Sequence, residues 1–409
     1  MYGKSNETKS LLYTSLGHFL NDGVYFLFPV IVTFFSIEKG FNPFFITLLF
    51  GLYYGSSALF TVYISYASDI SQNFGKNLSI GIALLSVGIA GLAYALTFSN
   101  FYYVFTIASI SSIIMGIGGG YYHPLGAAIL QKVSSSKTLG KNLGINGGLG
   151  SLGRALYPII LFELIVMFNY NISFGVISLI GFAGAFAIYL GLKNIDKGNN
   201  KNSNTKSNKA SSLRTSLTKG VLILAIITFV RSIATQGIVS WLPTYLSYTR
   251  GLGDSLSLGV MMTVIYTIAI VGQPIFGILL DVIDKRGLFI IATIGTGITT
   301  LGFIYLSGTL GIIFLIAFSF FNFSGFPLLM SLTKDYVKET SSLSNSLVWG
   351  IAGNTGMFIG PVITGYILEG TYSNLPYSFM LLAVSIIIIG IISFMLPKPS
   401  EKSKMPLFG

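Results

Sequence analysis

The chain has 409 residues, of which 52% are hydrophobic and only 9% are charged, and its formal net charge is +11. So few charged side chains cannot cover the surface of a soluble protein of this length, so we expect the lipid bilayer to solvate most of it. The basic residues are spread over many loops, which argues against nucleic-acid binding. Cysteine is absent and only two histidines are present, so we expect no disulfide, no metal site and no cofactor.

Twelve apolar segments are long enough to cross a bilayer, whose hydrocarbon core takes about 20 residues of helix. Lipid offers no hydrogen-bond partner to an open backbone, so each segment is expected to be helical. The first is too long for a signal-peptide core and no small-residue cleavage site follows it, so we expect it to be retained. We predict an all-α membrane protein with twelve transmembrane helices, near 11–35, 43–67, 77–97, 101–130, 142–168, 171–192, 220–248, 255–280, 287–307, 310–333, 343–368 and 376–397.

The basic residues also predict an orientation. With the N-terminus placed inside, 20 of the 24 Lys and Arg residues fall on inner loops or termini. Lys39 and Arg250 fall on outer loops, while Arg154 and Arg231 fall inside spans. Because cytoplasmic loops carry an excess of basic residues, this distribution predicts a multi-pass protein of the plasma membrane with both termini in the cytoplasm.

The spans divide into two sets of six. Residues 193–219 form the only long polar stretch between spans, and seven of them are basic. This composition is typical of a flexible, solvated linker. We predict an N-terminal six-helix bundle over 1–192, a cytoplasmic linker over 193–219 and a C-terminal six-helix bundle over 220–409.

The two halves repeat each other in sequence. A shift of 203 positions places residues 123–158 on 326–361 with seven identities in 36 positions, most of them Gly or Pro. The repeat predicts two pseudo-symmetric bundles around an axis along the membrane normal. Such halves are a transporter plan, with the substrate site between them at mid-depth.

The loops after the second and eighth spans share an acidic residue at a helix end and a glycine six positions later. They resemble the signature loop of the major facilitator superfamily, in which Gly-xxx-Asp closes a helix and a basic turn follows. The resemblance implies a gate whose Asp holds a neighbouring helix end until the halves move apart. The alternative is an ordinary solubilising turn. The expected gate residues are Asp69, Gly75, Lys76, Gly277, Asp281, Arg286 and Gly287.

The fifth and eleventh spans are rich in glycine near a proline, as in Gly153 followed by Tyr157-Pro158 and in Gly360-Pro361. These stretches resemble the glycine-proline motif of antiporters in the same superfamily. Small residues also let helices approach closely. The sequence leaves an antiport-specific role and plain packing open.

Ionisable residues inside the spans are few, and such groups are costly in hydrocarbon and commonly functional. At about 1.5 Å per residue, Asp22, Arg154 and Arg231 lie roughly 18–20 Å from the inner edge of the polar segments, near mid-bilayer. His18 and His123 share a shallower level, about 13 Å in. His18 and Asp22 are four residues apart and therefore share one helix face.

We predict that Asp22 carries the coupling proton and that His18 and His123 are relay or substrate contacts. The superfamily resemblance implies that spans 1, 4, 7 and 10 line the cavity. One Asp against Arg154 and Arg231 leaves a positive balance, which favours an anionic substrate. The alternatives are a structural Asp22–Arg154 ion pair and interhelical hydrogen bonds from the histidines. The aromatic residues expected at the cavity are Tyr122, Trp241, Phe326 and Trp349.

A closer resemblance lies in three stretches: Ser15-Leu16-Gly17-His18-Phe19-Leu20-Asn21-Asp22, Tyr122-His123-Pro124, and the run from Asn146 to Gly153. They are similar to the fosmidomycin-resistance type of efflux protein. The resemblance implies proton-driven export of small organic molecules, with His18, Asp22 and His123 functional.

We therefore predict a secondary active transporter that works by alternating access and exports an organic anion or drug-like molecule in exchange for protons. The first alternative is a proton symporter that imports an organic acid or other nutrient, and the second is a lipid flippase. The spans carry no nucleophile or metal-ligand constellation, so we do not expect an enzyme. The expected partners are a small-molecule substrate, protons and the lipid bilayer, without nucleic acid, and the expected state is a monomer.

Overall fold

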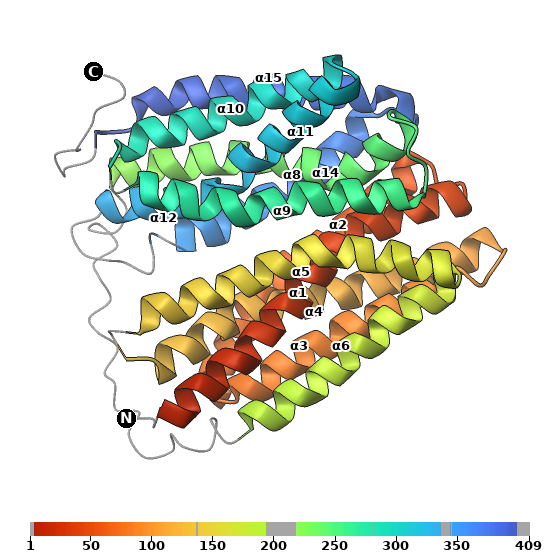
Figure 1. Ribbon diagram of the computed structural model, residues 1–409, viewed down its shortest axis with the longest axis horizontal. Helices are drawn as coiled ribbons and strands as arrows, with labels where there is room; N and C mark the ends of the chain where they lie inside the picture. Colours follow the sequence, from red (N-terminus) through yellow and green to blue (C-terminus); the bar gives the residue numbers. More distant parts are fainter. Residues whose placement is uncertain are drawn as a thin grey trace. The chain divides into compact units, whose positions relative to one another are not determined.

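The computed structural model describes residues 4–135, 138–193, 218–280, 282–336, 344 and 346–398, which are helices and short connections without a β-strand. Twelve helical segments of this part are long and apolar enough to cross a membrane, which confirms the predicted all-α class and span number. The elements (Figure 1) are α1 (Lys4–Glu38), α2 (Pro43–Ser71), α3 (Phe74–Ala95), α4 (Phe101–Val133), α5 (Leu139–Met167), α6 (Tyr170–Leu192), α8 (Lys219–Tyr248), α9 (Leu256–Leu279), α10 (Lys285–Tyr305), α11 (Gly308–Phe323), α12 (Gly325–Asp335), η2 (Ser346–Gly353), α14 (Asn354–Ile367), η3 (Tyr372–Asn374), α15 (Leu375–Ile392) and η4 (Ser393–Met395).

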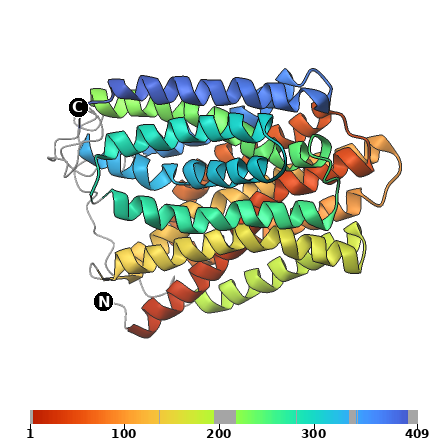
Figure 2. The same ribbon diagram turned by 45° about the horizontal axis from the view of Figure 1, so that its top comes forward.

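The chain divides into two compact units. Unit 1 comprises Met1–Asn204 with Gly251–Thr263, and unit 2 comprises Thr205–Arg250 with Val264–Gly409. Within each unit the long helices run side by side (Figures 1 and 2). Most of the predicted linker, residues 194–217, lies outside the described residues.

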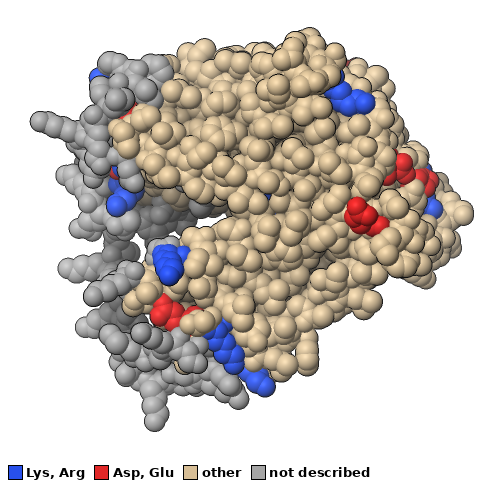
Figure 3. All heavy atoms as spheres, in the orientation of Figure 1, with Lys and Arg blue, Asp and Glu red and all other residues tan. Residues whose placement is uncertain are grey.

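The charged side chains lie near the helix ends on the face drawn in Figure 3, and a broad band of uncharged atoms separates them. Large apolar side chains are exposed in the spans, such as Leu59 and Phe186 at 76% and 64%. Exposed apolar surface of this extent is expected where lipid is the solvent.

In unit 1, α1 packs against α4, α5 and α6. The contact with α5 is close because Gly153 faces the backbone of Phe19, where an added β-carbon would overlap the Phe19 carbonyl group. Gly144 and Gly147, on the same helix, have no atom within 4 Å of an added β-carbon. The glycines of the fifth span therefore have different roles, and some of them serve helix packing.

In unit 2, α8 is buried along most of its length and packs against α14 and α15. Gly360 of α14 faces the backbone of Ile233 and Gly237 on α8, as Gly153 faces α1 in unit 1. Trp241 is completely buried, and its indole Nε1 donates to the Pro361 carbonyl oxygen at 2.9 Å. Trp241 is thus part of the packing between α8 and α14.

The tenth and eleventh spans are not continuous α-helices, although each was expected to be one. α11 ends at Phe323 and α12 begins at Gly325. Pro327 has no N–H to donate to the Phe323 carbonyl four residues earlier, which weakens the helix at this point, although α4 and α5 continue through Pro124 and Pro158. In the eleventh span, the described stretch from Ser346 onward is the π-helix η2 followed by α14.

Candidate functional site

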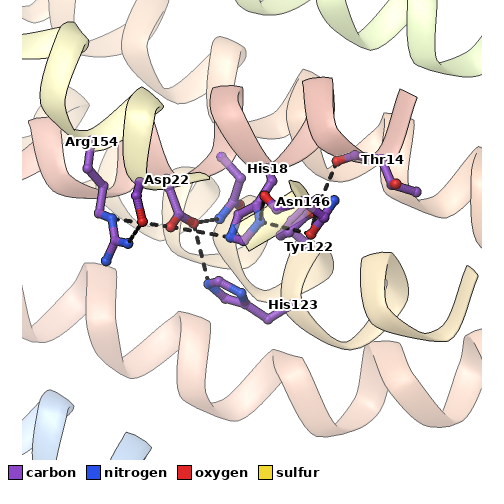
Figure 4. A network of polar contacts seen from close by, with 9 residues as sticks. Thr14, His18, Asp22, Tyr122, His123, Asn146 and Arg154 are labelled. Carbon is purple, nitrogen blue, oxygen red and sulfur yellow. Dashed lines mark hydrogen bonds and ion pairs between the residues drawn. The ribbon is translucent and has the colours of Figure 1, made fainter. Parts of the chain in front are cut away.

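Asp22, on α1, is 4% exposed and lies among three other groups that carry or accept protons. Its Oδ2 is 3.4 Å from His18 Nε2 and 3.6 Å from Arg154 Nε, and its Oδ1 is 3.6 Å from His123 Nε2. Figure 4 shows these side chains converging from α1, α4 and α5. We call His18, Asp22, His123 and Arg154 the Asp22 cluster. Four of the five residues predicted for coupling and substrate binding therefore lie together in unit 1.

Helix periodicity explains how α1 and α5 build the cluster. Thr14, His18 and Asp22 follow at intervals of four residues and share one face of α1. Asn146 and Arg154 are eight residues apart and share one face of α5. Of these residues, the sequence predictions did not include Asn146 or Thr14. The four-residue spacing of polar side chains along the two spans was the signal that would have found them.

His18 is held on three sides. Its Nδ1 lies 2.8 Å from the backbone carbonyl oxygen of Asn146 and 3.0 Å from the side-chain Oδ1 of the same residue. The ring of Tyr122 stacks on the imidazole with centroids 4.5 Å apart. The Tyr122 hydroxyl is 3.0 Å from both Asn146 Oδ1 and the Thr14 carbonyl oxygen. Tyr122, predicted as a cavity aromatic, is thus 2% exposed and belongs to the support of His18.

Arg154 is bound at several points. Its Nη2 donates to Ser151 Oγ at 2.6 Å, and its guanidinium lies 5.1 Å from the centre of the Phe26 ring. Asp22 also accepts a hydrogen bond from Asn21 Nδ2 at 3.1 Å. His123 differs from the other cluster residues because 62% of its side chain is exposed, against 12% for Arg154. His123 is therefore the most exposed member of the group around Asp22.

The charges of the cluster depend on its protons. With Asp22 ionised and Arg154 charged, the pair is formally neutral, and each protonated histidine adds one positive charge. The donor atoms of His18, Asp22 and His123 lie within 4.8 Å of one another, a spacing compatible with a metal ion. Arg154 already shares the same carboxylate, and its positive charge beside that oxygen disfavours a cation there.

Arg231 belongs to unit 2 and is 5% exposed. Its Nη2 donates to the Asn322 carbonyl oxygen at 3.1 Å, at the interruption between α11 and α12. An added β-carbon on Gly325 would lie 2.6 Å from Arg231 Nη1. Arg231 thus packs tightly against the helix interruption, and a contact with substrate stays a prediction.

The other predicted residues are placed as follows. Trp349 lies on η2 and is partly buried. The side chains of Phe326 and Asp69, and the whole of Asp281, lie outside the described residues. In the first gate loop Gly75 is buried and Lys76 is exposed, and in the second an added β-carbon on Gly277 meets no atom within 4 Å.

The second gate loop has its own internal bonds. Asp284 caps α10, because its Oδ2 accepts from the Gly287 N–H at 2.8 Å. Arg286 is buried, and its Nη1 donates to the Leu396 carbonyl oxygen at 3.1 Å. Lys285 pairs with Asp335 at 2.8 Å, which ties α10 to α12. These contacts connect helix ends within unit 2, and a gating role stays a prediction.

The sequence matches the family described as Major Facilitator Superfamily over residues 14–348. The chain belongs to this superfamily. A curated relative, the "Hexuronate transporter" of Bacillus subtilis (strain 168), is 25% identical over 350 residues, which cover 80% of each chain. The fold is also similar to solved structures at lower identity. A peptide transporter POT in complex with sulfate has a TM-score of 0.74 at 12% identity over 95% of this chain and 94% of that one.

A bacterial homologue of the human lysosomal transporter Spinster, in an inward-facing and occupied conformation, also has a TM-score of 0.74, at 14% identity over 97% of both chains. These similarities confirm the major facilitator fold. As a member of the superfamily, the chain is a secondary transporter of small solutes and not an enzyme.

Proposed function

We propose that this protein is a proton-coupled transporter of a small organic anion, acting as a monomer in the plasma membrane with both termini in the cytoplasm. The observation that carries the proposal is the Asp22 carboxylate, buried within 3.6 Å of His18, His123 and Arg154. Ionisable groups kept at such depth in a membrane protein are rare and mark ion or proton pathways. Asp22 is the coupling residue, and Arg154 is the anion-binding group.

The charges of the cluster favour symport. When Asp22 is ionised, it neutralises Arg154. A proton on Asp22 releases that positive charge, and a proton on His18 or His123 adds another, so each bound proton strengthens attraction for an anion. By linkage, a bound anion strengthens proton binding by the same factor. The relative named as a hexuronate transporter supports an anionic substrate, because a hexuronate is a carboxylate.

Export is the second candidate. It rests on the residues from Ser15 to Asp22 and on Tyr122-His123-Pro124, which resemble the fosmidomycin-resistance type of efflux protein and supply three members of the cluster. An exporter would use the same groups in exchange, with protons and substrate occupying the cluster in turn.

Flux in proteoliposomes tests both candidates, with glucuronate as a hexuronate probe and fosmidomycin as a phosphonate probe. Symport predicts that a probe accumulates on the alkaline side of an imposed pH gradient, and exchange predicts accumulation on the acidic side. Asp22→Asn is expected to abolish the response to the gradient while leaving counterflow of labelled probe. Accumulation by this variant equal to that of the unchanged protein would refute the coupling role of Asp22.

A further inference from the structure

The imidazole of His18 lies in a seat that two neighbouring helices provide. We use the name His18 seat for Asn146 and Gly150 of α5 together with Tyr122 of α4. Tyr122 covers one face of the ring at an interplanar angle of 25°. Gly150 lies against ring atoms Cδ2, Nε2 and Cε1. The seat is independent of how the two units are arranged, because all its residues belong to unit 1.

The bond at Nδ1 determines which ring nitrogen of His18 carries hydrogen. A backbone carbonyl oxygen can only accept, and the Asn146 carbonyl is 2.8 Å from Nδ1. Nδ1 therefore carries a hydrogen in both the neutral and the charged ring. In the neutral ring the lone pair is then on Nε2, which is directed at the Asp22 carboxylate 3.4 Å away.

Glycine at position 150 makes this arrangement possible. A β-carbon there would lie 2.5 Å from His18 Nε2 and 2.7 Å from Cε1, closer than real β-carbons approach such atoms. Alanine would displace the ring from α5 and from the Asn146 carbonyl one turn earlier. The neighbouring Gly147 and Gly148 have no atom within 4 Å of an added β-carbon. Position 150 is thus specific to the seat.

We propose that Asn146 and Gly150 are positioning residues that hold the His18 hydrogen on Nδ1, so that Nε2 relays the coupling proton to and from the Asp22 carboxylate. That the proton is the one coupled to transport rests on the proposed function. The choice of Nε2 as the titrating atom rests on the geometry alone. The charged or titratable groups around the ring are Asp22, His123, Arg154 and Tyr122. The assignment gives the glycine-rich run of α5 a role in proton handling besides helix packing.

Nitrogen NMR of ring-¹⁵N-labelled histidine in lipid nanodiscs tests the assignment without a substrate. The chain has two histidines, so the spectrum holds two rings, and His123→Gln leaves that of His18 alone. As pH rises, we expect the Nε2 resonance of His18 to move to the position of a bare nitrogen while Nδ1 stays protonated. A neutral ring with hydrogen on Nε2 would overturn the proposal, and so would a ring that does not titrate.

Variants separate the seat from general packing. Gly150→Ala is expected to give a mixture of both neutral forms and a shifted pH midpoint for His18, while Gly147→Ala and Gly148→Ala keep the original spectrum. Asn146→Ala retains the backbone carbonyl, so it is expected to preserve hydrogen on Nδ1. An unchanged spectrum for Gly150→Ala would contradict the seat. If Gly150→Ala does not fold, the His18 spectrum of the protein with Gly150 in place still shows which ring nitrogen carries the hydrogen.

The outcome is independent of the transport assay. A His18 spectrum with Nδ1 protonated, combined with flux that ignores a pH gradient, would leave the seat in place and reject the proposed function. The opposite combination would leave proton coupling in place and reject the assignment to Nε2.

Discussion

The carboxylate of Asp22 has two oxygens, which four neighbouring side chains share: those of His18, His123, Arg154 and Asn21. Arg154 and His18 share Oδ2, and His123 approaches Oδ1. None of these distances is short enough for a strong charge-assisted bond, which is typically 2.7–2.9 Å. The carboxylate is thus shared among several partners at distances longer than those of a tight ion pair.

Arg154→Lys tests whether the guanidinium itself binds the anion. Lysine keeps the positive charge but loses the planar fork that matches a carboxylate or phosphonate. We expect affinity for a glucuronate or fosmidomycin probe to fall about tenfold, the loss of one good charge-assisted bond. Binding is measured by ligand-induced thermal stabilisation. Arg250→Lys is the matched control, because Arg250 donates to the Leu306 carbonyl outside the cluster. Equal affinities for the two variants would contradict the assignment.

At the scale of the helices, α1 and α5 are held by glycines at two heights. Gly153 lets the backbones touch at Phe19, and Gly150 admits the His18 ring. The same design recurs in unit 2, where Gly360 meets Ile233. The glycines that packing requires are those whose added β-carbon would meet the neighbouring backbone.

Gly153→Ala is expected to lower the free energy of unfolding by about 1–3 kcal/mol, because the added methyl group overlaps the Phe19 backbone. Gly144→Ala, on the same helix, faces open space and is expected to leave stability unchanged or raise it by up to about 1 kcal/mol through helix propensity. Denaturant unfolding of each variant, in the same mixture of lipid and detergent, measures both free energies of unfolding. Similar losses for the two variants would refute close packing at Gly153.

The Asp22 cluster could be predicted from the sequence better than the interruptions in the tenth and eleventh spans. Spacing alone placed His18 and Asp22 on one face, and depth placed Asp22 level with Arg154. Asn146 and Gly150 could have been found by the same four-residue interval. Pro327 removes one ladder bond near the interruption at Phe323, but α4 and α5 continue through Pro124 and Pro158, so proline alone does not predict the interruption. The π-helix at Ser346–Gly353 has no comparable sequence signal, and such helices are rare.

At the scale of the whole molecule, the twelve spans follow from hydropathy because each segment must satisfy its own backbone bonds in lipid. The predicted orientation rests on a separate property, the excess of basic residues on one side. The partner of Arg231 could not be predicted from the sequence. Helix rise predicts the depth of Arg231, but its hydrogen-bond acceptor is the Asn322 carbonyl oxygen, 91 residues away at the end of α11.

Cysteine labelling tests the orientation directly, since the natural chain has no cysteine and serves as its own background. Ser99, an exposed residue between α3 and α4, is predicted to face outward, and Lys76, exposed on α3, to face the cytoplasm. A membrane-impermeant maleimide is expected to label Ser99→Cys in intact cells and Lys76→Cys only after permeabilisation. Labelling in the reverse order would overturn the predicted topology.

The repeated halves differ in how their matching spans are built. α4 and α5 of unit 1 each run without interruption, over 33 and 29 residues. Their counterparts in unit 2 are divided into α11 with α12 and η2 with α14. All four spans carry a proline, at positions 124, 158, 327 and 361, and each proline removes one ladder bond. In unit 2 the chain also leaves α-helical geometry, at Ser324 and over Ser346–Gly353. We therefore expect these two spans to bend more easily than α4 and α5.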